Sequence, residues 1–388
     1  MPIKNRLAET HAEITGWRRH LHARPELDFD VHETAAFVVD RLREFGVDDI
    51  TTGIGKTGVV AVIKGKTDTK GRVMGLRADM DALPIEEATG LDYASKHPGK
   101  MHACGHDGHT SILLGAAQYL AETRNFDGTA VLAFQPAEEG GGGGREMVND
   151  GLIDRWGIQE IYGLHNMPGL PTGQFAIRSG ALLASADEFY VTVTGKGGHA
   201  AAPHQAIDPN VAAAQIILAL QSITSRNVDP LESAVVSICA LHSDIDTHNI
   251  IPQVTRMTGT VRALDPDVRD QVEARVSEIS KAIGQAHQCE VEVDYRVGYP
   301  VTINHDEHTE YAAAAARAVA GDVITDTPPI MAAEDFAFML NACPGAYIML
   351  GNGDGPMVHH PEYQFDDEAI PAGASWFVEL VEQRMPAQ

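Results

Sequence analysis

The order of helix-like and strand-like segments is the feature that most constrains how this chain of 388 residues can fold. Up to about residue 185, segments with helical spacing alternate with short apolar segments that are typical of strands. The helical segments are 9–22, 33–45 and 108–122, and the strand-like segments are 58–64, 72–77, 129–135 and 160–164. This alternation predicts an α/β domain with a largely buried mixed sheet between helices.

A different order begins near residue 186. An alternating strand is followed by a helix from Asp208–Pro209 to about Ser225, two β-rich segments, a helix that begins at Asp265–Pro266, and a final alternating strand. Both Asp-Pro pairs are good helix starts. The order β-α-β-β-α-β predicts an α+β, split βαβ (ferredoxin-like) domain over residues 186–298. Helices expected at 307–320, 334–341 and 367–384 belong again to the first domain. Residues 1–185 and 299–388 are therefore expected to form one discontinuous domain.

Composition and charge exclude several functional classes. Apolar residues make up 44% of the chain and charged residues 21%, as in an ordinary globular protein. The net charge of −25 repels phosphate backbones and anionic lipid, so nucleic acid and membranes are poor partners. No export signal is visible in the first thirty residues, and no C-x-x-C pair occurs. We therefore expect a cytoplasmic protein with four reduced thiols, at Cys104, Cys239, Cys289 and Cys343.

The densest cluster of candidate ligands is MHACGHDGHT, residues 101–110, beside a predicted helix start. Cys104 and His106 are two residues apart, so both side chains can turn toward one ion from an irregular loop. A thiolate and an imidazole suit zinc and other transition metals. His102 and His109 either support such a site or are structural. The alternative for the whole cluster is a helix cap with surface histidines.

A pair of carboxylates follows the strand predicted at 129–135, in FQPAEEGGGGG. The carboxyl end of a strand is where α/β sheets place their ligands. Adjacent carboxylates point in different directions, so Glu138 and Glu139 can divide two roles between them, one binding a metal and one acting as general base. The alternative is a solvated charged turn. No Gly-Lys-Ser/Thr follows the glycines, so a phosphate-binding loop is excluded.

Isolated histidines and polar residues elsewhere can complete such a site. His165 ends a predicted strand, and His359 and His360 follow a glycine-rich turn. In the inserted domain, His199 lies in a glycine-rich turn, and Asn249 and Arg262 lie near the ends of neighbouring predicted strands. His199 could donate to an oxyanion, and the other two could hold a carboxylate. The alternatives are a hinge at the glycines and a surface salt bridge for Arg262.

Eight segments in order resemble the co-catalytic metal amidohydrolases, a family that includes hippurate hydrolase, bacterial N-acyl-amino-acid amidohydrolases and plant auxin-conjugate hydrolases. These segments are RRHLHARPEL, RADMDALPIEE, MHACGHDGHT, FQPAEEGGGGG, GLHNMPGLPTG, GKGGHAAAPH, HNIIP and GTVR, and they span nearly the whole chain. The resemblance implies a binuclear metal site in the discontinuous domain. It also implies that the inserted domain is a lid that mediates formation of a homodimer, or of a tetramer.

The same resemblance assigns roles to individual residues. It implies the metal ligands Cys104, His106, Glu139, His165 and His359, with His360 as the alternative to His359. Glu138 matches the general base, and Asp81 matches the acidic residue that supports the site. The residues that match the lid's substrate contacts are His199, Asn249 and Arg262. The chain departs from the family pattern at HSDIDTHNIIP, where a Gly-Gly usually precedes Asn-x-Ile-Pro.

The sequence therefore predicts a metal-dependent amidohydrolase that cleaves N-acyl amino acids to a carboxylic acid and a free amino acid. Two zinc or manganese ions are expected, and cobalt or nickel could also support activity. One alternative is a dipeptidase or aminopeptidase that uses the same site but anchors a free ammonium group. A second is a metal-binding protein without catalysis, in which Glu138 would have no role.

Overall fold

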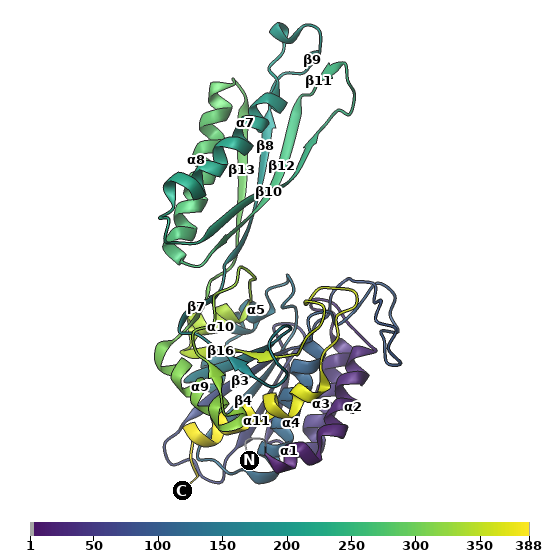
Figure 1. The fold of residues 1–388 in the computed structure, drawn as a ribbon, viewed down its shortest axis with the longest axis vertical. Coiled ribbons are helices and arrows are strands. Elements are labelled where there is room, and N and C mark those ends of the chain that lie inside the picture. Colours follow the sequence, from purple (N-terminus) through teal and green to yellow (C-terminus); the bar gives the residue numbers. More distant parts are fainter. Residues whose placement is uncertain (1–3, 388) are drawn as a thin grey trace. The chain divides into compact units, whose positions relative to one another are not determined.

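The computed structural model of the protein describes residues 4–387 (Figure 1). Contacts within the chain divide these residues into two compact units. Unit 1 contains residues 4–182, Ile303–Pro328 and 335–387, and unit 2 contains Leu183–Thr302 and Pro329–Glu334. The sequence predicted an inserted domain at residues 186–298. That this inserted domain acts as a lid stays a prediction. Within residues 4–387, no helix is both long and apolar enough to cross a membrane.

Unit 1 is built on a mixed sheet with the strand order β1-β2-β4-β3-β5-β16-β6-β15. Neighbours among β4, β3, β5 and β16 are parallel, whereas β2 is antiparallel to both β1 and β4. The strands are β1 (Asp49–Ile54), β2 (Gly58–Lys64), β3 (Val73–Asp79), β4 (Thr129–Gln135), β5 (Glu160–Met167), β6 (Phe175–Ala176), β15 (Val323–Ile324) and β16 (Gly345–Gly351). A parallel sheet of this kind must be buried, and every residue of β16 is.

Helices cover this sheet and share the apolar core of unit 1 with its strands. Helix α4 packs on β2–β5 and on α2, α3 and α11, whereas α9 packs on β16 and α11. The shorter α5 and α10 pack on each other and on strands of the sheet. The helices are α1 (Asn5–Glu9), α2 (His11–His22), α3 (His32–Phe45), α4 (His106–Thr123), α5 (Gly143–Asn149), α6 (Leu152–Trp156), α9 (Asp306–Ala320), α10 (Phe336–Ala342) and α11 (Ile370–Arg384).

Unit 2 has the predicted order of elements. Its antiparallel sheet has the strand order β10-β12-β8-β13, and α7 and α8 cover one face (Figure 1). The side chains of Asp208 and Asp265 cap the two helices, as the Asp-Pro pairs predicted. The elements are β8 (Ala186–Thr194), α7 (Pro209–Ser222), β10 (Ala234–Ser243), β12 (Val254–Ala263), α8 (Pro266–Ala286) and β13 (Glu290–Tyr299).

Small elements flank the sheet of unit 2. A two-stranded ribbon joins β9 (Gly198–His199) to β11 (Ile250–Ile251), and β7 (Gly180–Leu183) pairs with β14 (Thr302–Asn304) where the chain enters and leaves the insert. A 3-10 turn occupies Pro203–Gln205, and a π-helical turn, Ile223–Asn227, follows α7; another 3-10 turn, Asp367–Ala369, lies in unit 1.

Several sequence-based boundaries were wrong. The helix predicted at 9–22 is interrupted at Thr10, which divides α1 from α2. Strand β5 continues to Met167, because it remains paired with β16 up to that residue, so His165 lies inside the strand rather than at its end. Strands β1 and β16 were missed. The segment GAYIMLG of β16 is a short apolar run, which periodicity alone cannot assign to a strand or a helix.

The close pairing of β16 with β5 leads to a stability prediction. A Cβ atom added at Gly345 would lie 1.8 Å from the carbonyl oxygen of Ile161. Gly345→Ala should therefore force the two strands apart and lower the free energy of unfolding by about 1–3 kcal/mol, as overpacking does. At Gly16 in α2 an added Cβ meets nothing within 4 Å, so Gly16→Ala is the matched control and should raise stability by up to about 1 kcal/mol. Equal unfolding midpoints for both variants in urea would contradict this prediction.

Candidate metal and catalytic site

The parallel strands β4, β3, β5 and β16 bring their carboxyl ends to one edge of the sheet. Asp81 follows β3, Glu138 and Glu139 follow β4, His165 lies near the end of β5, and His359 follows β16. His106 is the first residue of α4, which packs against β3. This edge is where ligands bind in open α/β sheets.

Among the described residues, three overlapping groups of potential metal ligands contain the ligands that the resemblance implied. In each group the ligand atoms lie within 4.8 Å of one another, and the groups are Cys104–His106–His165, Cys104–Glu139–His359 and His106–Glu138–Glu139. Cys104 Sγ lies 3.4 Å from His165 Nε2, and His359 Nε2 lies 3.2 Å from Glu139 Oε1. The structure thus brings together the five side chains that the resemblance assigned as ligands, with Glu138 beside them.

Asp81 holds the two adjacent glutamates in different orientations. Its carboxylate accepts the backbone N–H groups of Glu138 and Glu139, each at 3.0 Å, and its Oδ1 lies 3.4 Å from His106 Nδ1. The turn before Glu138 is tight, because Ala137 has a positive φ of 54°. A Cβ at Gly143 would lie 1.7 Å from the carbonyl oxygen of Pro136, which explains a glycine at that position.

The backbone also positions His165 and His359. His165 Nδ1–H donates to the carbonyl oxygen of Asn166 at 2.7 Å, which leaves Nε2 with its lone pair toward Cys104. His359 has a left-handed backbone with φ of 67°, and its N–H donates to Ala103 at 2.7 Å. A left-handed histidine carries a conformational cost of order 1–3 kcal/mol, so the surrounding loops must hold it in place.

His359 and His360, the two alternatives for one ligand, have different surroundings in the structure. His359 belongs to a group of potential metal ligands, whereas His360 does not. The Nδ1 atom of His360 accepts the backbone N–H of Glu362 at 3.1 Å, and the side chains of both histidines are exposed.

Burial and negative charge dominate the electrostatics of this site. Burial raises the pKa of the Cys104 thiol well above its usual value, and Glu139 and Glu138 raise it further. Burial lowers the pKa of His106, but Asp79 and Asp81 outweigh this effect and bring it to about 10. Burial lowers the pKa of His165 to about 3. The site therefore has an excess of buried negative charge that cations would relieve.

The chemistry of these residues fits divalent metal ions. Both ring nitrogens of His106 are buried and have no hydrogen-bond partner among the described residues, with Glu139 Oε1 3.9 Å from Nε2. A buried imidazole without a hydrogen bond is costly, and a metal ion would satisfy it. Thiolate, imidazole and carboxylate ligands together match zinc and related transition metals.

The structure excludes the two alternatives to a metal site that the ligand motifs left open. His102, His106 and His109 are all at most 1% exposed, so they are not surface histidines. Glu138 is 6% exposed, and thus does not lie in a solvated turn. His109 donates from Nδ1 to Asp79 at 2.7 Å, which gives it a supporting role, whereas His102 belongs to none of the ligand groups.

Two supporting residues escaped the sequence analysis. Asp79 lies at the end of β3, where it binds His109 and Arg77, and its pKa is held well below the usual value by nearby His106 and Arg77 despite burial. It lies in the same RADMD segment as Asp81, but sequence alone gave no reason to prefer either aspartate. Asn166 directly follows His165, and no local signal marks its side chain as part of the site.

In unit 2, the structure brings His199 and Asn249 together. His199 pairs with Ile250 across the β9–β11 ribbon, and Ala200 N–H donates to the carbonyl oxygen of Asn249. Nδ1 of His199 accepts the N–H of Ala201 at 3.0 Å, so the neutral ring carries its proton on Nε2 and can donate from there.

Within a single chain, the structure places Asn249 and Arg262 toward opposite ends of β12. Asn249 precedes the Val254 end of β12, whereas Arg262 is close to the other end, about 26 Å away at ~3.3 Å per residue. Arg262 Nη1 donates to the carbonyl oxygen of Val261 at 2.9 Å, and the side chain is half-buried. It forms no ion pair with any residue in 4–387, so the surface salt-bridge alternative is wrong.

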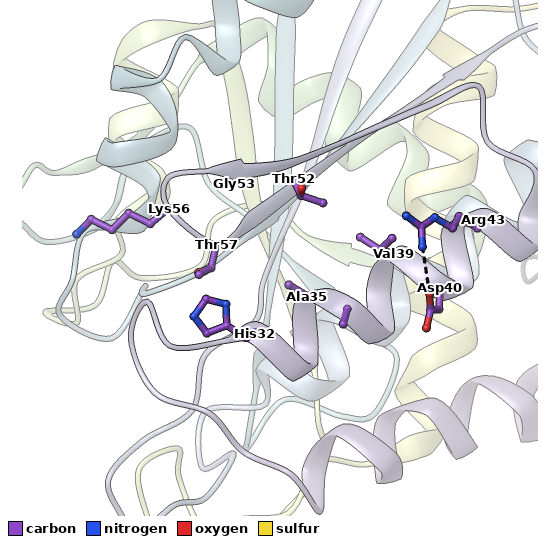
Figure 2. A pocket seen from close by; sticks show the side chains of 10 residues that line it. His32, Ala35, Val39, Asp40, Arg43, Thr52, Gly53, Lys56 and Thr57 are labelled. Carbon is purple, nitrogen blue, oxygen red and sulfur yellow. Dashed lines mark hydrogen bonds and ion pairs between the residues drawn. The ribbon is translucent and has the colours of Figure 1, made fainter.

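A separate hollow of about 370 Å³ lies between α3 and the turn after β1 (Figure 2). Its lining includes His32, Lys56 and the ion pair of Asp40 with Arg43, whose atoms are 3.5 Å apart. None of the site residues predicted from the sequence lines this hollow.

Known proteins resemble this chain over almost its whole length. It is 44% identical over 377 residues to hippurate hydrolase from Campylobacter jejuni, covering 96% of this chain and 97% of the relative. It is 43% identical over 373 residues to N-acetyl-L-cysteine deacetylase from Bacillus subtilis, covering 96% and 88%. A solved structure from Bacillus subtilis, a dinuclear metal binding peptidase from the M20 family, is 34% identical with a TM-score of 0.86, covering 98% of this chain and 100% of that chain.

The family model described as peptidase family M20/M25/M40 matches residues 75–383. That match runs from β3 to α11 and includes every candidate metal ligand. The fold, the ordered motifs and the relatives agree, and the chain belongs to the peptidase family M20/M25/M40.

Proposed function

We propose that this protein hydrolyses the amide bond of N-acyl amino acids to give a carboxylic acid and a free amino acid. The observation that carries the proposal is the convergence of Cys104, His106, Glu139, His165 and His359 at one sheet edge, with a further buried carboxylate beside them. The names of two relatives support the substrate class, since one is a hippurate hydrolase and the other an N-acetyl-L-cysteine deacetylase.

The five ligands would hold two divalent metal ions, as in the related structure described as dinuclear. Zinc suits a site that contains Cys104 and three imidazoles, and manganese is the next candidate, with cobalt and nickel as substitutes. When bound, such ions lower the pKa of a water molecule and polarise the substrate carbonyl.

Glu138 would act as the general base and then as the acid. It would take a proton from the attacking water and deliver it to the leaving amine nitrogen, which must be protonated as the amide bond breaks. Two contacts support this role by fixing its position. Asp81 accepts its backbone N–H, and its Oε1 accepts the N–H of Asp335 at 3.4 Å.

His199 would donate from Nε2 to the oxyanion that forms on the substrate carbonyl, and Arg262 and Asn249 would bind the substrate carboxylate. Because Asn249 precedes the Val254 end of β12 and Arg262 lies about 26 Å from Val254 along that strand, a single carboxylate cannot bind both from the same chain. The proposal therefore requires a homodimer in which His199 and Asn249 reach the substrate of the partner subunit.

Exposed apolar residues of unit 2 support dimerisation through this unit. Val211 and Leu218 on α7 are 49% and 73% exposed, and Leu241 on the edge strand β10 is 48% exposed. Residues seven apart lie on one face of a helix, so the α7 pair forms one apolar surface beside the sheet edge. A cytoplasmic location is part of the same proposal and agrees with four thiols that form no disulfide.

A substrate panel tests the proposed reaction. The protein, reconstituted separately with zinc, manganese, cobalt or nickel, should release amino acid from N-acetyl, N-benzoyl and longer N-acyl amino acids. Dipeptides with a free ammonium group should be poorer substrates, because no described residue is identified as an anchor for that charge. Faster release from dipeptides than from every N-acyl compound would favour the dipeptidase alternative.

The two adjacent glutamates should separate by their effects on metal and rate. Glu138→Gln should retain metal and lose roughly 10²–10⁴-fold in kcat, the usual contribution of a positioned acid or base. Glu139→Gln should lose metal first, as measured by metal content after dialysis. The reverse pattern would exchange the two roles, and full activity of Glu138→Gln with unchanged metal content would show that Glu138 is not the general base.

A mixing experiment tests whether His199 acts on the partner subunit. His199→Ala should keep its metal and its dimeric state but lose roughly 10²–10³-fold in kcat, as for the loss of one oxyanion donor. A heterodimer with one His199→Ala chain and one Glu138→Gln chain contains one intact shared site, because both defects fall on the other. Subunit exchange should restore up to about half of wild-type activity per heterodimer. Demonstrated exchange without recovery would mean that His199 acts within its own chain or has no catalytic role.

A further inference from the structure

Asn166 lies at the centre of the metal site without offering it a ligand atom. It follows His165 on β5 and is 1% exposed. Its Nδ2 group donates to the carbonyl oxygen of Cys104 at 2.5 Å, and its Oδ1 atom accepts the hydroxyl of Tyr363 at 2.7 Å. Both ends of the amide are thus bound, each to a different loop.

The backbone of Asn166 makes two further contacts at the site. Its N–H donates to Nε2 of His109 at 2.9 Å, and its carbonyl oxygen accepts Nδ1–H of His165 at 2.7 Å. The first bond requires the His109 proton to be on Nδ1, where it donates to Asp79. The second bond directs the other nitrogen of His165 toward Cys104.

These contacts join three segments that carry candidate ligands. The loop of Cys104 is held through its carbonyl oxygen, β5 carries His165, and Tyr363 belongs to the loop of His359, where its N–H donates to the carbonyl oxygen of His360 at 2.9 Å. The three segments are far apart in sequence, and the Asn166 side chain is hydrogen-bonded to the two loops at once.

The backbone at Gly105 is shaped to this amide. Gly105 has a positive φ of 91°, and a Cβ there would lie 2.4 Å from Asn166 Nδ2 and 2.6 Å from the Tyr363 hydroxyl oxygen. Only glycine therefore lets the Cys104–Gly105 backbone approach the amide closely enough for the hydrogen bond. The position of the Cys104 thiol and the position of the Asn166 side-chain amide therefore depend on each other.

We infer that Asn166 is a positioning residue that sets the separation between the Cys104 thiol and the His165 imidazole, and thereby the affinity of the site for metal. The inference rests on the proposed role of these two side chains as ligands. Partners of metal ligands that make no bond to the metal typically contribute about 10–100-fold in affinity. Asn166→Ala should therefore weaken metal binding by roughly that factor.

Asn304 provides a matched control. It lies in unit 1 and, like Asn166, is 1% exposed. Its Nδ2 group donates to the carbonyl oxygens of Arg178 and Tyr347, both at 2.9 Å, and its Oδ1 atom accepts the N–H of Tyr347 at 2.7 Å. Asn304→Ala removes a similar set of buried hydrogen bonds but touches no candidate ligand. It measures the effect of lost stability alone.

The experiment compares wild type, Asn166→Ala and Asn304→Ala by zinc affinity against a chelator and by thermal unfolding without metal. Cobalt-loaded samples add the absorption band of thiolate-to-cobalt charge transfer, which reports directly on Cys104. Asn166→Ala should lose zinc affinity by about 10–100-fold and shift or weaken the band, whereas Asn304→Ala should lose stability only. Unchanged affinity and band in folded Asn166→Ala, or equal zinc losses in both variants, would overturn the inference.

A second variant decides the case in which Asn166→Ala does not fold. Tyr363→Phe removes only the hydroxyl that donates to Asn166 Oδ1. This variant should bind zinc severalfold more weakly and show the same change in the cobalt band. If its zinc affinity and its cobalt band are those of the wild type, the inference is overturned. A wild-type protein that binds cobalt without the thiolate band would instead show that Cys104 is not a ligand. That result contradicts the ligand set of the proposed function and removes the premise for Asn166.

Discussion

The parallel pairing of β4, β3, β5 and β16 is the constraint on which the candidate site depends. Parallel neighbours end on the same side, so the chain leaves each strand at one sheet edge. Residues from 81 to 359 meet there although they are distant in sequence. The strands β2 and β6 pair antiparallel with β4 and β16 and so flank the four parallel strands. Neither β2 nor β6 contributes a candidate ligand.

Burial of acidic groups makes this edge suited to cations. Asp79, Asp81 and Glu138 are at most 6% exposed, and the guanidinium of Arg77 is already bonded to Asp79 and Asp335. The pKa of His106 rises to about 10 for the same reason, since carboxylates surround its ring. Without a cation beside them, ionised carboxylates at these buried positions would lower the stability of the folded state. Divalent ions bound by Cys104 and the histidines would therefore stabilise the folded site as well as serve catalysis.

Local patterns in the sequence were enough for much of the fold and for the ligand clusters. Apolar periodicity and Asp-Pro pairs located α7, α8 and the strands between them, and the spacing within the motif at 101–110 was enough to indicate Cys104 and His106 as candidate ligands. What failed depended on contacts between distant residues. The extent of β5 is set by its pairing with β16, and the importance of Asn166 lies in hydrogen bonds to Cys104 and Tyr363.

The separation of Arg262 from His199 and Asn249 is a third non-local fact, and it bears on how the proposed reaction can occur. Sequence placed Asn249 and Arg262 near the ends of neighbouring strands, but only the register of β12 with β8 shows that the ends are opposite ones, since Val254 pairs with Thr194 near the β9 ribbon and Val261 with Asp187. One small substrate cannot span about 26 Å of strand. If all three side chains contact the substrate, two copies of unit 2 must contribute to each site, and catalysis then depends on assembly because a single chain lacks part of the machinery.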